Sequence, residues 1–163
     1  MKAVVVYESL WGNTGTVARA IAEGLGPEAQ AFSTAEVTPE VAAAADLLVA
    51  GAPVQAFSLP SARIRAGITA DTDPRPDLSA PTLRSWLDSL PAGRGAYAAF
   101  DTKIRWSPGS AASVIEEELQ RAGFKAIARS QHFVVAGKFG PLKDGEIDRA
   151  RAWGRELAAA ARN

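Results

Sequence analysis

The sequence of 163 residues contains no cysteine and only one histidine, His132. Without cysteine there are no disulfides, thiolate metal sites or cysteine nucleophiles, and one histidine excludes a histidine-rich metal site. A surplus of either charge is missing too, because 18 basic side chains balance 18 acidic ones. The sequence therefore lacks the basic stripe of a nucleic-acid-binding protein, and we expect no nucleic-acid partner.

Long hydrophobic runs are also absent. The first apolar run, residues 3–7, is short and leads into Glu8 without a small-residue cleavage site, which is unlike a signal peptide. No stretch approaches the roughly 20 apolar residues of a membrane helix, so we expect a cytoplasmic protein with no membrane span. Hydrophobic residues still make up 47% of the chain. This composition and length predict one domain, residues 1–163, with its own core.

Segments typical of strands and of helices alternate along the chain. The valine-rich segment 2–8 predicts a strand buried on both faces of a sheet. Segment 14–25 has apolar residues at every fourth position, which predicts a helix. The alternation continues with strands expected at 29–33, 46–51, 95–101 and 125–135, the last long or split, and helices at 38–45, 61–66, 83–90, 110–122 and 147–157. Repeated strand–helix units predict an α/β fold, a parallel sheet with helices on both faces.

Three loops of this predicted fold are the candidates for a ligand site. In open parallel sheets, ligands bind outside the carboxyl ends of the strands, near the point where the strand order reverses. The loops that follow the first, third and fourth strands are therefore the most informative. They span residues 9–14, 52–60 and 101–109.

The first loop has the chemistry of a phosphate site. Ser9, Asn13 and Thr14 supply polar side chains, and Gly12 permits a tight turn. The amides at the start of the following helix carry partial positive charge, so a phosphate can bind without lysine or arginine. The loop matches neither the lysine-containing loop of nucleotide hydrolases nor the dinucleotide-binding turn. The alternative is a simple strand-to-helix turn with Thr14 as the helix cap.

This loop resembles the phosphate loop of flavodoxins, which reads Ser-x-Thr-Gly-Asn-Thr between a strand and a helix. Here it reads Ser9-Leu10-Trp11-Gly12-Asn13-Thr14, so Trp11 replaces a hydroxyl residue with a large ring. The resemblance covers essentially the whole chain and is strongest to small flavodoxin-domain proteins of actinobacteria. It implies a flavodoxin-like three-layer sandwich, with a five-stranded parallel sheet of order 2-1-3-4-5, and flavin mononucleotide (FMN) as the cofactor.

The resemblance also implies which residues contact the flavin. Phe57 in the second loop and Trp106 in the third are candidates to stack on the ring, and Asp101 to face it. Each has an alternative: Phe57 as an oligomer contact or loop anchor, Asp101 as a turn cap, and Trp11 as a lid over the first helix. The complete set of expected cofactor-binding residues is Ser9, Leu10, Trp11, Gly12, Asn13, Thr14, Pro53, Val54, Gln55, Phe57, Asp101, Thr102, Lys103 and Trp106. We expect no metal site, and no residue is assigned a catalytic role.

Two functions remain open at this point. The first is a flavin-dependent redox protein, either an electron carrier with a redox partner protein or a small reductase acting on a quinone-like molecule, as a monomer or homodimer. Typical carrier flavodoxins are strongly acidic, and this chain has no net charge. The alternative is a flavodoxin fold without flavin, in a regulatory or assembly role. A phosphorylation receiver domain is disfavoured. It needs an acidic pair after the first strand and a phosphoacceptor aspartate after the third, where this chain has Glu8-Ser9 and Gly51-Ala52-Pro53.

Overall fold

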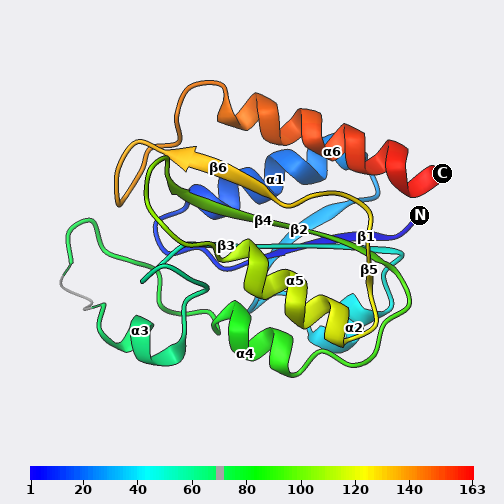
Figure 1. Cartoon of the computed structure of the whole chain (residues 1–163), viewed down its shortest axis with the longest axis horizontal. Coiled ribbons are helices and arrows are strands. Elements are labelled where there is room, and N and C mark those ends of the chain that lie inside the picture. The colour runs from blue at the N-terminus through cyan, green and yellow to red at the C-terminus, as the bar shows by residue number, and fades with distance from the viewer. Residues whose placement is uncertain (69–71) are drawn as a thin grey trace.

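A single parallel sheet forms the centre of the molecule (Figure 1). The computed structural model describes residues 1–68 and 72–163. The strands run in the order β2-β1-β3-β4-β5, which confirms the predicted order, and β6 also pairs with β4. Their bounds are β1 (Ala3–Tyr7), β2 (Gln30–Ser33), β3 (Leu47–Pro53), β4 (Ala96–Ile104), β5 (Lys125–Ala126) and β6 (Gln131–Val135).

The last position in the sheet is divided between two short strands, as the long or split segment 125–135 predicted. β5 pairs with the beginning of β4, and β6 pairs with its end, from Phe100 to Ile104. Pairing with β6 extends β4 three residues beyond its predicted end at Asp101. The extension carries Thr102, Lys103 and Ile104 to the carboxyl edge of the sheet, where the site lies.

Helices cover both faces of the sheet, as predicted. One core layer lies between the sheet and the pair α1 (Asn13–Leu25) and α6 (Glu146–Arg162). The other includes side chains of α2 (Pro39–Ala43), α4 (Leu83–Asp88) and α5 (Ala112–Arg121). The short α3 (Ala62–Ala66) lies near α4 (Figure 1).

The residues at the helix starts explain several of these bounds. The side chains of Thr38, Ser61 and Thr82 accept hydrogen bonds from the backbone at the starts of α2, α3 and α4. Such caps satisfy N–H groups that have no partner within the helix. α3 lies within the long stretch 52–79, of which positions 69–71 lie outside the described residues.

Close contact between α1 and α6 depends on glycine. A Cβ atom at Gly154 would lie 2.3 Å from the Ile21 carbonyl oxygen, and one at Gly24 would lie 2.0 Å from that of Arg151. Two tryptophans complete the cores on opposite sides of the sheet. Trp153 on α6 and Trp86 on α4 are about 5% and 4% exposed. No helix of the described residues is long and apolar enough to cross a membrane.

Candidate functional site

The loop between β1 and α1 is organised around the hydroxyl of Ser9. Ser9 Oγ accepts hydrogen bonds from the amides of Gly12, at 3.1 Å, and Gly15, at 3.2 Å. Gly12 directly precedes the helix and has a φ of +93°, a backbone angle that residues with a side chain rarely adopt. The amides of Asn13 and Thr14 then open α1, where the helix dipole adds partial positive charge. The sequence therefore builds a turn that is rich in hydrogen-bond donors.

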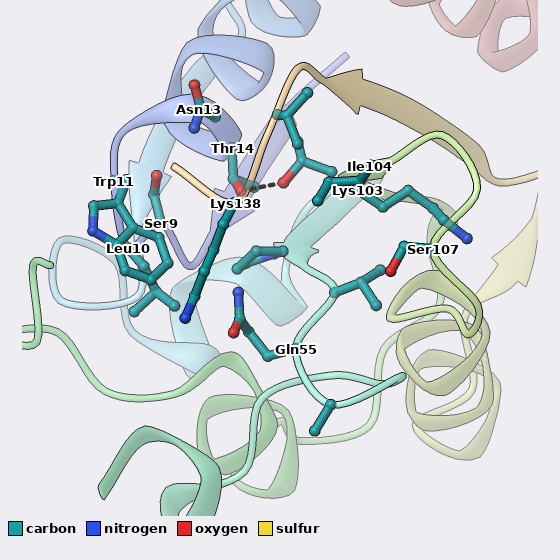
Figure 2. A pocket seen from close by; sticks show the side chains of 15 residues that line it. Ser9, Leu10, Trp11, Asn13, Thr14, Gln55, Lys103, Ile104, Ser107 and Lys138 are labelled. Atoms are coloured by element: carbon teal, nitrogen blue, oxygen red, sulfur yellow. Dashed lines mark hydrogen bonds between the residues drawn. The ribbon is translucent and has the colours of Figure 1, made fainter. Parts of the chain in front are cut away.

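Two side chains at the start of α1 tie this turn to neighbouring segments. Thr14 Oγ1 lies 2.8 Å from Thr102 Oγ1 of β4, and both residues are buried (Figure 2). Asn13 Nδ2 donates a hydrogen bond of 3.1 Å to the carbonyl of Phe139 in the loop after β6. At Gly140 a Cβ would lie 2.5 Å from Asn13 Oδ1. The turn is therefore held between β4 and the loop 136–141.

A pocket of about 190 Å³ opens between these segments, at the carboxyl ends of β1, β3 and β4 (Figure 2). It combines all three loops that the sequence singled out. The predicted site residues that line it are Ser9, Leu10, Trp11, Asn13, Thr14, Pro53, Val54, Gln55, Thr102 and Lys103. The residues that line it without having been predicted are Ala56, Ile104, Ser107, Val135 and Lys138.

Four predicted site residues do not line this pocket: Gly12, Phe57, Asp101 and Trp106. Gly12 instead shapes the backbone of the first loop. Phe57 and Trp106 are 67% and 81% exposed, so neither forms a wall of the pocket. Each lies next in sequence to a residue that does line it, Ala56 or Ser107.

Asp101 faces away from the pocket and is completely buried. Its Oδ2 accepts hydrogen bonds from the amides of Ala111 and Ala112, both at 3.0 Å, and from Ser110 Oγ at 3.2 Å. Its Oδ1 lies 2.6 Å from Nδ1 of His132. The prediction that this carboxylate faces a bound ring is wrong, because the beginning of α5 draws it to the other side. The alternative, that Asp101 caps a turn, is confirmed.

Trp11 forms one wall of the pocket and anchors the loop around it. Its ring packs edge-on against Phe139, with ring centroids 4.8 Å apart. Its Nε1 donates a hydrogen bond of 2.9 Å to the carbonyl of Pro74, while the Leu10 carbonyl accepts one of 2.7 Å from the Asp77 amide. A second cavity of about 490 Å³ also borders Ser9, Leu10 and Trp11. Trp11 therefore contributes to the walls of two cavities.

The charged residues that line the pocket are both cationic. They are Lys103 at the end of β4 and Lys138 in the loop after β6. Figure 2 shows the Lys138 side chain extending across the pocket. Lys103 Nζ donates a hydrogen bond of 2.8 Å to the Gly109 carbonyl, outside the lining. An anion in this pocket would therefore meet the positive charge of Lys138 and no carboxylate among the described lining residues.

The residue before the first loop, Glu8, is a buried carboxylate. It is 2% exposed, and its Oε1 accepts a hydrogen bond of 2.8 Å from the Leu83 amide at the start of α4. Its Oε2 has no hydrogen-bond partner among the described residues and lies 3.9 Å from Nη1 of Arg65. Burial raises the pKa of Glu8 to about 7, although the Leu83 amide, Arg65 and Arg84 oppose this rise. A buried group that titrates near neutrality therefore adjoins the site.

A strained turn forms the opposite lip of the pocket. Gln55 and Ser58 pair through two backbone hydrogen bonds, of 2.9 and 3.0 Å, around Ala56 and Phe57. The φ angles of Ala56 and Phe57 are +46° and +70°. Glycine and asparagine usually occupy such turns, because other side chains are strained at positive φ. Strain of this kind is often retained where it serves a site.

Comparison with known proteins identifies the fold of this chain. No family model matches the sequence, and no curated protein matches it. Solved structures do match, among them a flavodoxin from the domain Archaea, at 20% identity over 100% of both chains with a TM-score of 0.71. Flavodoxin 1 from Bacillus cereus matches at 18% identity over 98% of both chains, also at 0.71. The chain has a flavodoxin-like fold. A flavodoxin from Pseudomonas aeruginosa matches at 20% identity over 100% of both chains, at 0.66.

The flavodoxin-like fold explains which site residues the sequence revealed and which it hid. Loops after β1, β3 and β4 meet at one edge in this topology, so their residues were found from strand order. Lys138 and Phe139 come from the loop after β6, about 125 positions after Asn13. Gly137 and Gly145 flank this loop in the sequence, but they do not indicate that it reaches the first loop. Among the described residues, no group of three or more histidine, aspartate or glutamate side chains is placed to hold a metal ion.

Proposed function

We propose that the pocket binds FMN and that the protein transfers electrons to and from a redox partner. The observation that carries this proposal is the donor-rich turn of residues 9–14. It opens a helix and borders a pocket at the carboxyl edge of a flavodoxin-like sheet. This is the position in which α/β folds of this kind hold phosphate-containing ligands.

The residues present fit the phosphate of FMN. The amides of Asn13 and Thr14 and the hydroxyls of Ser9 and Thr14 would hold it, because a helix N-terminus binds a dianion through N–H groups and its dipole. Lys138 compensates for the hydroxyl that Trp11 replaces, since it adds a positive charge across the same pocket. The pocket of about 190 Å³ is smaller than the roughly 300–1,000 Å³ typical of ligand sites. A bound FMN would therefore project beyond its mouth.

When bound, FMN supplies reversible electron acceptance, and the protein supplies position and electrostatics. The Gln55 side chain offers hydrogen bonds to a polar ligand edge, while the Thr102 hydroxyl positions that of Thr14 for the phosphate. Lys138 favours added negative charge in the pocket, because opposite charges attract more strongly away from bulk water. This lysine therefore favours reduction of the ligand, compared with a neutral or acidic pocket.

A flavodoxin fold without flavin is the second candidate, and one observation favours it. Ser9 Oγ already accepts the amides of Gly12 and Gly15, and Trp11 occupies space where the flavodoxin loop has a smaller hydroxyl residue. In this arrangement the amides of Gly12 and Gly15 already have a hydrogen-bond acceptor within the protein and need no phosphate. The protein would then use the fold for regulation or assembly, with no redox reaction.

Comparing FMN with riboflavin separates these candidates, because riboflavin lacks only the phosphate. Two charge-assisted hydrogen bonds of about 1.5 kcal/mol each correspond to an affinity ratio of about 100 in favour of FMN. Thr14→Val should weaken FMN binding roughly tenfold and leave riboflavin binding unchanged. Thr16→Val is the matched control, because Thr16 lies two positions after Thr14 on α1 and its hydroxyl donates a hydrogen bond to the Gly12 carbonyl instead. Equal affinity for both ligands, or no binding of either, would reject the proposed phosphate site.

A further inference from the structure

The second cavity shares the loop 9–14 with the first pocket and lies on its β2 side. Its lining comes from the ends of β1 and β2, the start of α1, Phe139 and the segment 74–80, whereas the first pocket extends toward β3 and β4. Its volume of about 490 Å³ falls within the roughly 300–1,000 Å³ typical of ligand sites. Gly12 and Gly15 line this cavity and not the first pocket, so the donor-rich turn borders both spaces.

Two carboxylates line this cavity, and each is held by the backbone beside it. Glu36, just after β2, accepts a hydrogen bond of 2.8 Å from the Ser33 amide through Oε1. Asp77 Oδ1 accepts hydrogen bonds from the Ser79 hydroxyl, at 2.6 Å, and the Ser79 amide, at 2.9 Å, and these lower the pKa of Asp77. In dinucleotide-binding α/β folds, an acidic residue about 20 positions after the glycine-rich turn accepts a hydrogen bond from the ribose. Glu36 holds a similar position relative to Gly12.

An arginine lies beside the start of α1 in the same cavity. A Cβ at Gly15 would lie 3.3 Å from Arg19 Nη1 and 3.0 Å from Tyr7 Cε2, so glycine leaves room there for both side chains. Arg19 Nη2 donates a hydrogen bond of 3.3 Å to Thr16 Oγ1, which donates one of 2.9 Å to the Gly12 carbonyl. These bonds hold the guanidinium near the turn. A phosphate there would meet the arginine as well as the positive end of the helix dipole.

Three aromatic rings, those of Tyr7, Trp11 and Phe139, complete the lining. Nucleic-acid bases stack on such rings whatever their sequence. The charges of the lining cancel, because two cationic and two anionic side chains contribute to it: Arg19, Arg75, Glu36 and Asp77. The carboxylates disfavour a simple anion and the arginines a simple cation. A ligand with a phosphate, hydroxyl groups and a planar ring in separate places matches all three kinds of lining residue.

We propose that the second cavity binds a nucleoside 5′-phosphate, with its phosphate at Arg19, its ribose hydroxyls at Glu36 and Asp77, and its base against the aromatic rings. Two sources supply this chemistry: the adenylate half of a dinucleotide flavin (FAD) whose flavin half occupies the first pocket, or a free nucleotide. The first source fits the shared turn, since a ligand with its phosphates at this turn can extend into both spaces. The proposal rests on the proposed function only where the nucleotide is part of a flavin.

Isothermal titration calorimetry with FMN, FAD and AMP tests this site and separates the two sources. If the nucleotide is the adenylate half of a flavin, FAD should bind at least about tenfold more tightly than FMN. If it is a free nucleotide, AMP should bind to protein already saturated with FMN or, where FMN does not bind, to the protein alone. Equal affinities for FMN and FAD, together with no AMP binding or with AMP binding that FMN abolishes, would overturn the proposal.

Matched variants locate the nucleotide. Arg19→Ala and Glu36→Gln should each weaken binding of FAD or AMP about tenfold and leave FMN binding within about twofold. Glu36→Gln keeps an oxygen for the Ser33 amide. The controls, Arg155→Ala on α6 and Glu117→Gln on α5, change exposed residues outside the cavity and should alter none of these affinities. Equal effects within either pair would refute the site.

The same titrations distinguish failure of this site from failure of the proposed function. FMN binding with no preference for FAD and no simultaneous binding of AMP would refute the nucleotide site alone. AMP binding that Arg19→Ala weakens, without binding of FMN, would refute the proposed function alone.

Discussion

Glu8 makes the stability of this protein depend on pH in an unusual direction. In the folded chain, burial raises its pKa from 4.5 to about 7. Between these values the unfolded chain has lost a proton that the folded chain still holds. Stability therefore falls as the pH rises through this window, whereas a carboxylate stabilised by an ion pair behaves in the opposite way.

The size of the effect follows from the gap between the two pKa values. One pKa unit corresponds to about 1.4 kcal/mol, so the gap amounts to about 3 kcal/mol, most of it lost between pH 5 and pH 8. Glu8→Gln keeps an oxygen for the Leu83 amide and removes the charge. The variant should therefore match the wild type near pH 4.5 and be more stable by about 3 kcal/mol at pH 8. For a chain of this size, that is a rise in Tm of about 6–12 °C.

Thermal unfolding of both proteins from pH 4.5 to 8.5, followed by circular dichroism, measures this difference directly. Subtracting one stability curve from the other removes the contribution of every titrating group that the substitution does not affect. Glu117→Gln on α5 is the control, because Glu117 is exposed and its substitution should give a difference that does not change with pH. A constant difference for Glu8→Gln, or a loss of stability at pH 8, would show instead that the ion pair with Arg65 outweighs the cost of burial.

Three further substitutions test the packing, each by urea denaturation. Asp101→Ala should cost about 2–4 kcal/mol, because the amides of Ala111 and Ala112 lose their buried acceptor; a loss below 1 kcal/mol would contradict the capping role. Phe57→Gly should gain about 1 kcal/mol by relieving the positive φ, and a loss would mean that the ring contributes to packing. Gly154→Ala should cost about 1–3 kcal/mol, since its Cβ would lie 2.3 Å from the Ile21 carbonyl oxygen; an unchanged stability would show that α1 and α6 separate easily.

Much of the fold was predictable because its signals are local. Valine-rich strands buried on both faces and helices with regular apolar spacing differ in period, so the alternation of elements can be read directly. The caps at Thr38 and Thr82 likewise follow from residue type. The extension of β4 to Ile104 was missed, because it depends on pairing with β6, about 30 residues away.

The site was predictable where strand order places it and unpredictable where side-chain direction decides. Residues of the first loop other than Gly12, and residues 53–55, line the pocket as expected. Asp101 and Thr102 are neighbours on β4, yet they point to opposite faces of the sheet, so a one-residue difference sends Asp101 to α5 and Thr102 to the pocket. Lys138 was missed because only the folded loop after β6 brings it across the site. No local sequence pattern encodes that contact.

The central claim is that this pocket holds FMN, and an absorption and fluorescence titration tests it most directly. The purified protein is measured as isolated and then during addition of FMN, with Thr14→Val and Thr16→Val in parallel. We expect a shifted flavin spectrum, quenched flavin fluorescence and saturation at one FMN per chain, weakened by Thr14→Val alone. A colourless protein whose addition leaves the spectrum and fluorescence of free FMN unchanged would contradict the claim. The second candidate, a flavodoxin-like fold without a redox role, would then stand.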